Sequence, residues 1–205
     1  MRKFFLFIAL IISGVGFVNA QNFGSTVTID YGTYLLKFTV INVDPAECEV
    51  ICPTAYEPTV NYNVVIPEKV TIEGAEFPVT RIGNDAFKSN SITSYAERLK
   101  SVSIPNTVTS IGNNAFQNCR GLVGITIPNN VTTIGYSAFK DCKGLLGITI
   151  PNNVETMGNY AFSGCSKLSV VTFEEVSKLT VLNNYVFESC TALTNIEIPN
   201  SVTSI

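Results

Sequence analysis

A unit of 23 residues repeats through the second half of the chain and constrains its fold more than any other feature. Prolines, phenylalanines and cysteines recur at this spacing: Pro105, Pro128 and Pro151, Phe116, Phe139 and Phe162, Cys119, Cys142 and Cys165. A fixed period in the twenties is typical of solenoids, in which each coil buries its apolar side against its neighbours. We therefore predict an α/β-type repeat solenoid, mostly β, over residues 64–205, with five to six units of which the last is incomplete.

One unit predicts how a coil is built. Ile125 and Ile127 alternate as in a strand with one buried face, which places Gly124 and Thr126 on the outer face. Pro128 has no N–H for a neighbouring strand, so we expect the strand to end there. The following apolar residues predict a second short strand and then a helical or 3₁₀ turn before the coil closes at a cysteine.

Residues 21–63 do not repeat, and we expect them to form an N-terminal β cap over the first coil. Residues 34–43 alternate as in a strand, and Pro45 and Pro53 indicate a loop after it. Residues 70–79 predict a hairpin inserted into the first, degenerate repeat, with its turn at Glu73–Gly74.

The N-terminal segment, residues 1–20, has the pattern of a signal peptide. Arg2 and Lys3 precede an apolar run, and Val18–Asn19–Ala20 resembles a cleavage site. The run is shorter than the roughly 20 residues that a spanning helix needs, which argues against a membrane anchor. We expect a secreted or cell-surface protein with no transmembrane segment after cleavage near Ala20.

The six cysteines fall into two groups. Cys48 and Cys52 lie in the predicted loop of the cap, where export makes a local disulfide plausible; a metal site is disfavoured because the chain has no histidine. Cys119, Cys142, Cys165 and Cys190 belong to the repeats and should stack one per coil. Strand spacing of about 4.8 Å would permit disulfides between coils, but buried thiols acting as small apolar side chains are the favoured interpretation.

The repeat resembles the BspA-type leucine-rich repeat family of secreted and surface proteins. The matching pattern is Cys-x-x-Leu-x-x-Ile-x-Ile-Pro-x-x-Val-x-x-Ile-Gly-x-x-Ala-Phe, which runs from Cys119 to Phe139 and from Cys142 to Phe162, with Met157 at one Ile position. The resemblance implies a right-handed leucine-rich repeat solenoid with 23-residue coils. It also implies adhesion to host matrix proteins or to other cells.

The residue types give little support to an enzyme. Without histidine, the Ser-His-Asp triad, Cys-His pairs and the zinc motif H-E-x-x-H are all excluded. Glu174 and Glu175 are adjacent and should point to opposite faces, so they do not form an acid–base couple. We predict no catalytic residues, no metal and no cofactor, and the net charge of −3 gives no basic patch for nucleic acid.

The exposed face of the repeat strands is the candidate binding surface for a protein or glycan. It offers small, hydroxyl-rich side chains, two per coil: Ser101 and Ser103, Gly124 and Thr126, Gly147 and Thr149, Val170 and Thr172, Asn195 and Glu197. The alternative is that serine and threonine simply suit exposed strands.

Three functions follow from these observations. The first is an extracellular binding or adhesion module, because solenoids present extended surfaces. The second is a structural element that self-associates through its C-terminal coil, where no cap pattern is found and an open strand edge invites pairing. The third, an enzyme that needs only carboxylates, has no supporting constellation.

Overall fold

The computed structural model describes residues 24–205 except 32–33, 44, 56–60 and 90–96, and for Tyr34, Val43 and residues 51–55 it describes the backbone alone. The predicted signal peptide lies outside the described residues. The described residues contain strands and hydrogen-bonded turns and no α-helix. In order, the strands are β1 (Thr26–Asp30), β2 (Tyr34–Val43), β3 (Ala46–Ala55), β4 (Tyr62–Val65), β5 (Lys69–Ile72), β6 (Ala75–Ile82), β7 (Leu99–Ser103), β8 (Ser110–Ile111), β9 (Gly124–Ile125), β10 (Thr133–Ile134), β11 (Gly147–Ile150), β12 (Thr156–Met157) and β13 (Val170–Phe173).

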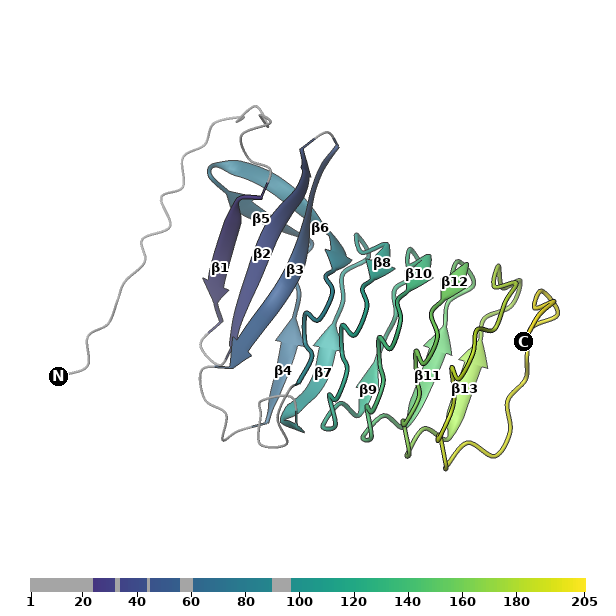
Figure 1. Ribbon diagram of the computed structural model, residues 1–205. Coiled ribbons are helices and arrows are strands. Elements are labelled where there is room, and N and C mark those ends of the chain that lie inside the picture. Colours follow the sequence, from purple (N-terminus) through teal and green to yellow (C-terminus); the bar gives the residue numbers. More distant parts are fainter. Residues whose placement is uncertain (1–23, 32–33, 44, 56–60, 90–96) are drawn as a thin grey trace.

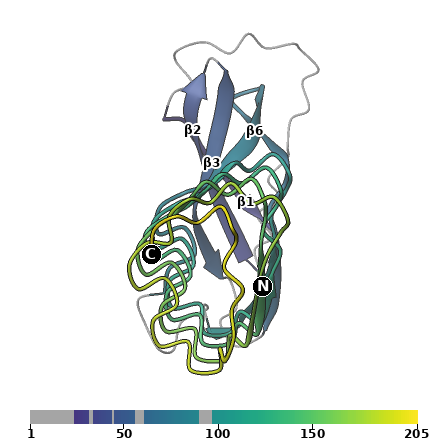
Figure 2. The ribbon, with the colours of Figure 1, turned by 90° about the vertical axis from the view of Figure 1, so that its right-hand side faces the viewer.

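Successive coils stack side by side along one axis and build parallel strands on two faces (Figure 1). On one face, β6, β8, β10 and β12 pair in that order. On the other, β4 pairs with β7 and β7 with β9, and β11 pairs with β13. Viewed along the axis in Figure 2, the coils overlie one another as nested loops. The mostly β repeat solenoid that the period predicted is confirmed.

The turn after the second short strand is not α-helical, and its i→i−3 bonds are those of the 3₁₀ alternative, made as single turns. Ala138 N–H donates to Gly135 O at 3.3 Å and Lys140 N–H to Ser137 O at 3.1 Å, which are bonds of single turns. Phe139 N–H instead donates to Ala161 O of the next coil at 2.7 Å. Because the backbone bonds to the neighbouring coil, the i→i−4 pattern of a helix cannot form there.

Strands β1, β2 and β3 form an antiparallel sheet at the N-terminal end of the solenoid, where the cap is predicted (Figure 1). The sheet joins the solenoid through parallel pairing of β3 with β6. Leu36, Phe38 and Val40 of β2 are fully buried, as their alternation predicts. The inserted hairpin is also confirmed: β5 pairs antiparallel with β6, and Glu73 and Gly74 both have positive φ, as a tight hairpin turn requires.

The loop expected between Pro45 and Pro53 is instead strand β3, which runs through both Cys48 and Cys52. Pairing with β2 continues through Pro53 to Ala55 and overrides the proline signal, and Cys48–Val50 also pair with β6. Cys48 is a buried, free thiol, and the side chain of Cys52 is outside the description. Four residues of extended strand span about 13 Å, which exceeds the Cα separation of a disulfide, so the geometry argues against the predicted bridge.

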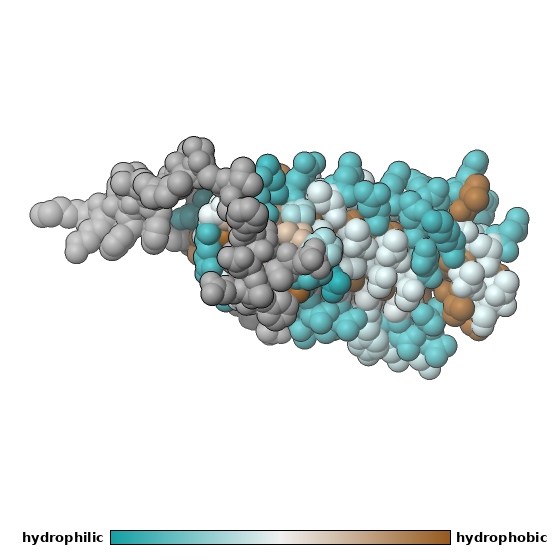
Figure 3. Space-filling view, turned by 90° about the horizontal axis from the view of Figure 1, so that it is seen from above, coloured by the Kyte–Doolittle hydropathy of each residue, from teal (hydrophilic) through white to brown (hydrophobic). Residues whose placement is uncertain are grey.

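Aromatic stacking links the coils inside the solenoid. The rings of Phe87, Phe116, Phe139 and Phe162 are fully buried. Centroids of successive rings are 4.9, 5.1 and 5.0 Å apart, with interplanar angles of 12°, 6° and 4°. Seen from above in Figure 3, the solenoid surface is mostly hydrophilic or neutral, so the apolar residues of the repeat are chiefly inside. The 23-residue spacing of Phe116, Phe139 and Phe162 thus becomes a continuous ladder, and Phe87 extends it from 29 residues earlier.

The repeat cysteines form a second ladder and are free thiols, as favoured above. Each Sγ donates to a phenylalanine carbonyl of the preceding coil: Cys119 to Phe87, Cys142 to Phe116, Cys165 to Phe139 and Cys190 to Phe162, at 3.1–3.2 Å. Burial raises the pKa of the Cys119 and Cys142 thiols well above its usual value. The thiols of Cys119 and Cys142 therefore stay protonated and keep their donor role.

Replacing Phe139 by Ala should lower the free energy of unfolding by about 3–5 kcal/mol, because the buried ring and both of its stacking contacts are lost. Phe187→Ala is the matched control. Its ring is only partly buried and stacks on Phe162 at 5.7 Å, so its loss should cost clearly less. Urea unfolding followed by circular dichroism measures both. Equal losses would contradict the ladder as the dominant packing element.

Stability should fall as the pH rises above about 8.5, where an unfolded thiol ionises. A raised folded pKa keeps the proton in the native state, so the thiols' contribution is complete below that pH and declines above it. For each such thiol, the free energy of unfolding should fall by about 1.4 kcal/mol for every pH unit above about 8.5. Urea unfolding under reducing conditions at pH 7, 8.5 and 9.5 tests this. In Cys142→Ala, the free energy of unfolding should fall less steeply with pH, by the share of one thiol. An unchanged slope would contradict a raised pKa for Cys142.

Candidate functional site

An open groove follows the exposed strand face across successive coils. It has a volume of about 890 Å³ and is lined from β7, β9, β11 and β13. Eight predicted residues line it: Ser101, Ser103, Gly124, Thr126, Gly147, Thr149, Val170 and Thr172. The other two, Asn195 and Glu197, line an adjoining hollow of about 300 Å³ that shares Val170 and Thr172. The structure thus brings all ten onto one continuous surface.

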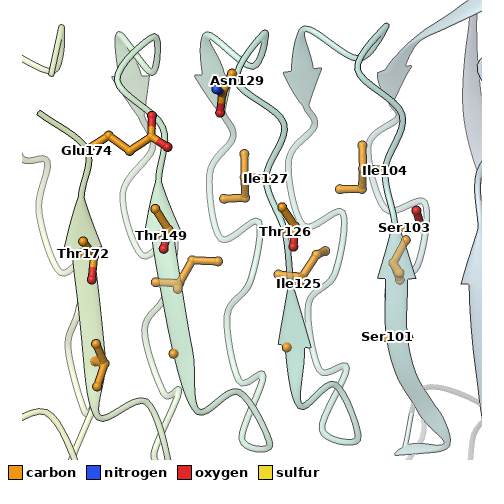
Figure 4. A pocket seen from close by; sticks show the side chains of 15 residues that line it. Ser101, Ser103, Ile104, Ile125, Thr126, Ile127, Asn129, Thr149, Thr172 and Glu174 are labelled. Atoms are coloured by element: carbon orange, nitrogen blue, oxygen red, sulfur yellow. The ribbon is translucent and has the colours of Figure 1, made fainter. Parts of the chain in front are cut away.

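Alternation along each strand explains why these side chains face outward. Ile148 and Ile150 of β11 are buried, and Thr149 between them is exposed. Parallel pairing in register then aligns the coils: Gly147 lies opposite Val170 and Thr149 opposite Thr172. Figure 4 shows Thr126, Thr149 and Thr172 as a row on successive strands. A ligand along these three strands would meet one threonine hydroxyl per coil.

The hydroxyls of Thr126, Thr149 and Thr172 have no hydrogen-bond partner within the described part of the protein. Threonines beside the opposite sheet differ. Thr109 Oγ1 donates to Thr80 O and Thr132 Oγ1 to Thr109 O, both at 3.3 Å, which ties one coil to the next. The groove threonines therefore keep their hydrogen-bonding capacity for solvent or a ligand.

Two glycines in the groove are not required by the fold. A Cβ on Gly124 would meet nothing within 4 Å, and on Gly147 only ordinary contacts with Val170, the nearest at 3.6 Å. Neither has a left-handed backbone. Glycine weakens a strand, and one that is sterically unnecessary marks a place where another molecule can approach the backbone closely.

Two polar side chains that line the groove, Asn129 and Glu174, were not among the predicted residues. Glu174 takes the place of the repeat proline in its coil, and its carboxylate accepts from Asn152 N–H at 3.1 Å. It is the one charged side chain among the groove-lining residues, and Figure 4 places it at the end of the threonine row. The departure from the repeat proline was the signal that the sequence offered for this residue.

The groove has the character of a binding surface. Its lining combines hydroxyls, bare backbone and partly exposed isoleucine, without a nucleophile paired to a base. In the described residues no group of three or more His, Cys, Asp or Glu side chains is placed to hold a metal ion. The same residues include no helix long and apolar enough to cross a membrane.

Comparison with known families decides the assignment. The family described as "BspA type Leucine rich repeat region" matches residues 80–205, with six copies of its repeat. The chain belongs to the BspA-type leucine-rich repeat family. Among curated proteins, none matches this family member significantly.

Solved structures share the leucine-rich repeat fold. A leucine-rich cell surface protein from Faecalibacterium prausnitzii is 29% identical, with a TM-score of 0.58, over 87% of this chain and 50% of that one. A leucine-rich repeat protein from Bacteroides capillosus is 32% identical, with a TM-score of 0.56, over 72% and 98%. The pneumococcal vaccine antigen PcpA is 23% identical, with a TM-score of 0.68, over 89% and 46%, and shows the fold alone. The chain spans about half the length of the first and third of these proteins.

Alanine substitutions should distinguish a groove glycine that the fold does not need from a glycine that the fold requires. Gly147→Ala should leave the protein as stable or raise the free energy of unfolding by about 0.5–1 kcal/mol, because it adds a side chain to a strand where there is room. Gly144→Ala is the matched control three residues away. Its Cβ would lie 2.6 Å from Arg120 O, so it should cost about 1–3 kcal/mol. Thermal unfolding of both variants measures the contrast, and a destabilised Gly147 variant would show that the fold needs this glycine.

Proposed function

We propose that this leucine-rich repeat protein is an extracellular binding module that adheres to matrix proteins or to other cells through the groove over β7, β9, β11 and β13. The observation that carries the proposal is the row of unpartnered hydroxyls beside glycines that the fold does not require. Such a surface can hydrogen-bond an extended polypeptide or glycan while the ligand lies close to the backbone.

The spacing of the coils supports weak contacts that repeat. Two neighbouring coils present the same pair of residues, Gly124 and Thr126 and then Gly147 and Thr149, and the next coil keeps the threonine as Thr172. The groove contains no large aromatic side chain, the type that dominates tight interfaces. Affinity should therefore come from several coils engaging a repetitive ligand at once.

Export to the cell surface or the medium belongs to the same proposal. It rests on the pattern of residues 1–20 and on the similarity to a protein described as a leucine-rich cell surface protein. Self-association through the C-terminal coil remains the alternative. Sedimentation velocity over a range of protein concentrations tests it on the same samples.

Binding of the purified chain to a panel of matrix proteins and glycans tests the groove. Thr126→Arg combined with Thr149→Arg should weaken binding at least about tenfold, which is 1.4 kcal/mol, because the long side chains fill the groove and cover the hydroxyl row. The melting temperature should not change, since both threonines are exposed.

The matched control is Thr156→Arg combined with Thr180→Arg. It adds the same charge at exposed positions that do not line the groove. Binding should survive in the control. Equal loss in both variants would assign the effect to charge, and no binding by the folded wild type would refute adhesion to the panel.

A further inference from the structure

Three tyrosines lie side by side on the surface, outside the groove. Tyr136 follows β10, Tyr160 follows β12, and Tyr185 takes the equivalent place in the next coil. The ring centroids of Tyr136 and Tyr160 are 5.7 Å apart in an edge-to-face pair, and those of Tyr160 and Tyr185 are 4.8 Å apart and stacked. Tyr136 is 47% exposed and Tyr185 56%. We call these three residues the tyrosine row.

The backbone does not favour tyrosine at two of these positions. Tyr160 and Tyr185 have φ values of 60° and 61°, in the left-handed region. Earlier coils have Asp85 and Asn114 at the same place, with φ of 56° and 54°. Aspartate and asparagine adopt this conformation more readily than a bulky side chain, for which it is an outlier. Such outliers gather at functional sites.

Tyr136 interrupts a hydrogen-bonded ladder instead. In the two preceding coils the residue after the glycine is asparagine. Asn84 Oδ1 accepts from Asn113 N–H at 2.7 Å, and Asn113 Oδ1 accepts from Tyr136 N–H at 2.8 Å. The hydroxyl of Tyr136 is at the far end of its ring and cannot take this acceptor role for the next coil. All three tyrosines thus replace side chains that suit the local backbone better.

The surroundings of the row suit a cation. Lys140 Nζ lies 5.1 Å from the centroid of the Tyr160 ring, so the ring already attracts an ammonium group. Glu188 lies on the same coil as Tyr185, and its Oε2 accepts from Ser163 Oγ at 3.2 Å. The pKa of Tyr160 is raised by desolvation and then by the charges of Tyr185 and Glu188, which keeps its phenol neutral. Ring faces next to a carboxylate attract guanidinium and ammonium groups.

We propose that the tyrosine row, with Glu188, is a second interaction surface that takes arginine or lysine side chains of a partner polypeptide. It goes beyond the groove proposed above, because it lies on the turns after β10 and β12, whereas β9 and β11 line the groove. Tyrosine supplies large, rigid contact area at low conformational cost, which is why it is enriched where proteins bind one another. The chain's net charge of −3 favours the same basic partner.

The probe is a fluorescein-labelled peptide of alternating glycine and arginine, with a second peptide in which neutral citrulline replaces every arginine. Fluorescence anisotropy at physiological salt measures binding to the full chain. Wild type should bind the arginine peptide at least about tenfold more tightly than the citrulline peptide. Equal binding of the two, or no binding of either, overturns the proposal.

The variant combines Tyr136→Asn, Tyr160→Asn and Tyr185→Asn. It leaves the net charge unchanged, so nonspecific attraction is preserved, and it restores the residue type that earlier coils use. Binding should weaken at least about tenfold, and the melting temperature should stay the same or rise. Unchanged affinity, or a clear fall in melting temperature, overturns the proposal, since the second result would make the tyrosines structural.

Gly124→Leu is the groove control. It places a neutral side chain in open space within the groove and should not affect binding of the arginine peptide. If Gly124→Leu abolishes that binding while the tyrosine variant retains it, the peptide binds in the groove. That outcome would support the groove as a binding surface and overturn the tyrosine row.

Discussion

Backbone hydrogen bonds between neighbouring coils, repeated at equivalent positions, are the constraint on which this structure depends. Gly112 N–H donates to Ile82 O, Gly135 N–H to Ile111 O and Gly158 N–H to Ile134 O, each at 2.8 Å. These bonds keep successive coils in register. Once the register is set, identical residues must stack on identical residues. The phenylalanine ladder, the thiol ladder and the row of groove threonines all follow from this one condition.

Because hydrogen bonds between coils and inward packing hold the fold together, the outward residues of the strand face are not needed for stability. Residues that turn inward or bond to the next coil are held closely to the repeat, as the cysteine thiols show by donating to the preceding coil. Outward residues on the strand face have no such task, so they can vary without loss of the fold. Glycines with room for a side chain and tyrosines in left-handed turns both depart from what the backbone favours. Such departures are where function is best sought.

Periodicity made much of the fold predictable. The alternation of Ile125, Thr126 and Ile127 was enough to assign the inner and outer faces, and the outer residues do line one groove. Export, adhesion and the ligand remain proposals, because none depends on the packing of the coils. The turn after the second strand was less predictable. Its backbone N–H groups bond to the next coil and so cannot form an α-helix. The sequence of a single unit does not show this competition.

The sequence by itself determined the repeat, its register and the inward set of side chains, because a fixed period leaves one way to bury every coil. Only the tertiary structure decided which local signals gave way. Pro53 does not end β3, since the strand stays paired with β2 as far as Ala55, and the extended segment from Cys48 to Cys52 argues against a bridge. Tyr136, Tyr160 and Tyr185 are not spaced at one interval, and only coil stacking brings their rings together. The physical reason is that pairing between coils is a long-range interaction, whereas proline, cysteine and tyrosine spacing is local information.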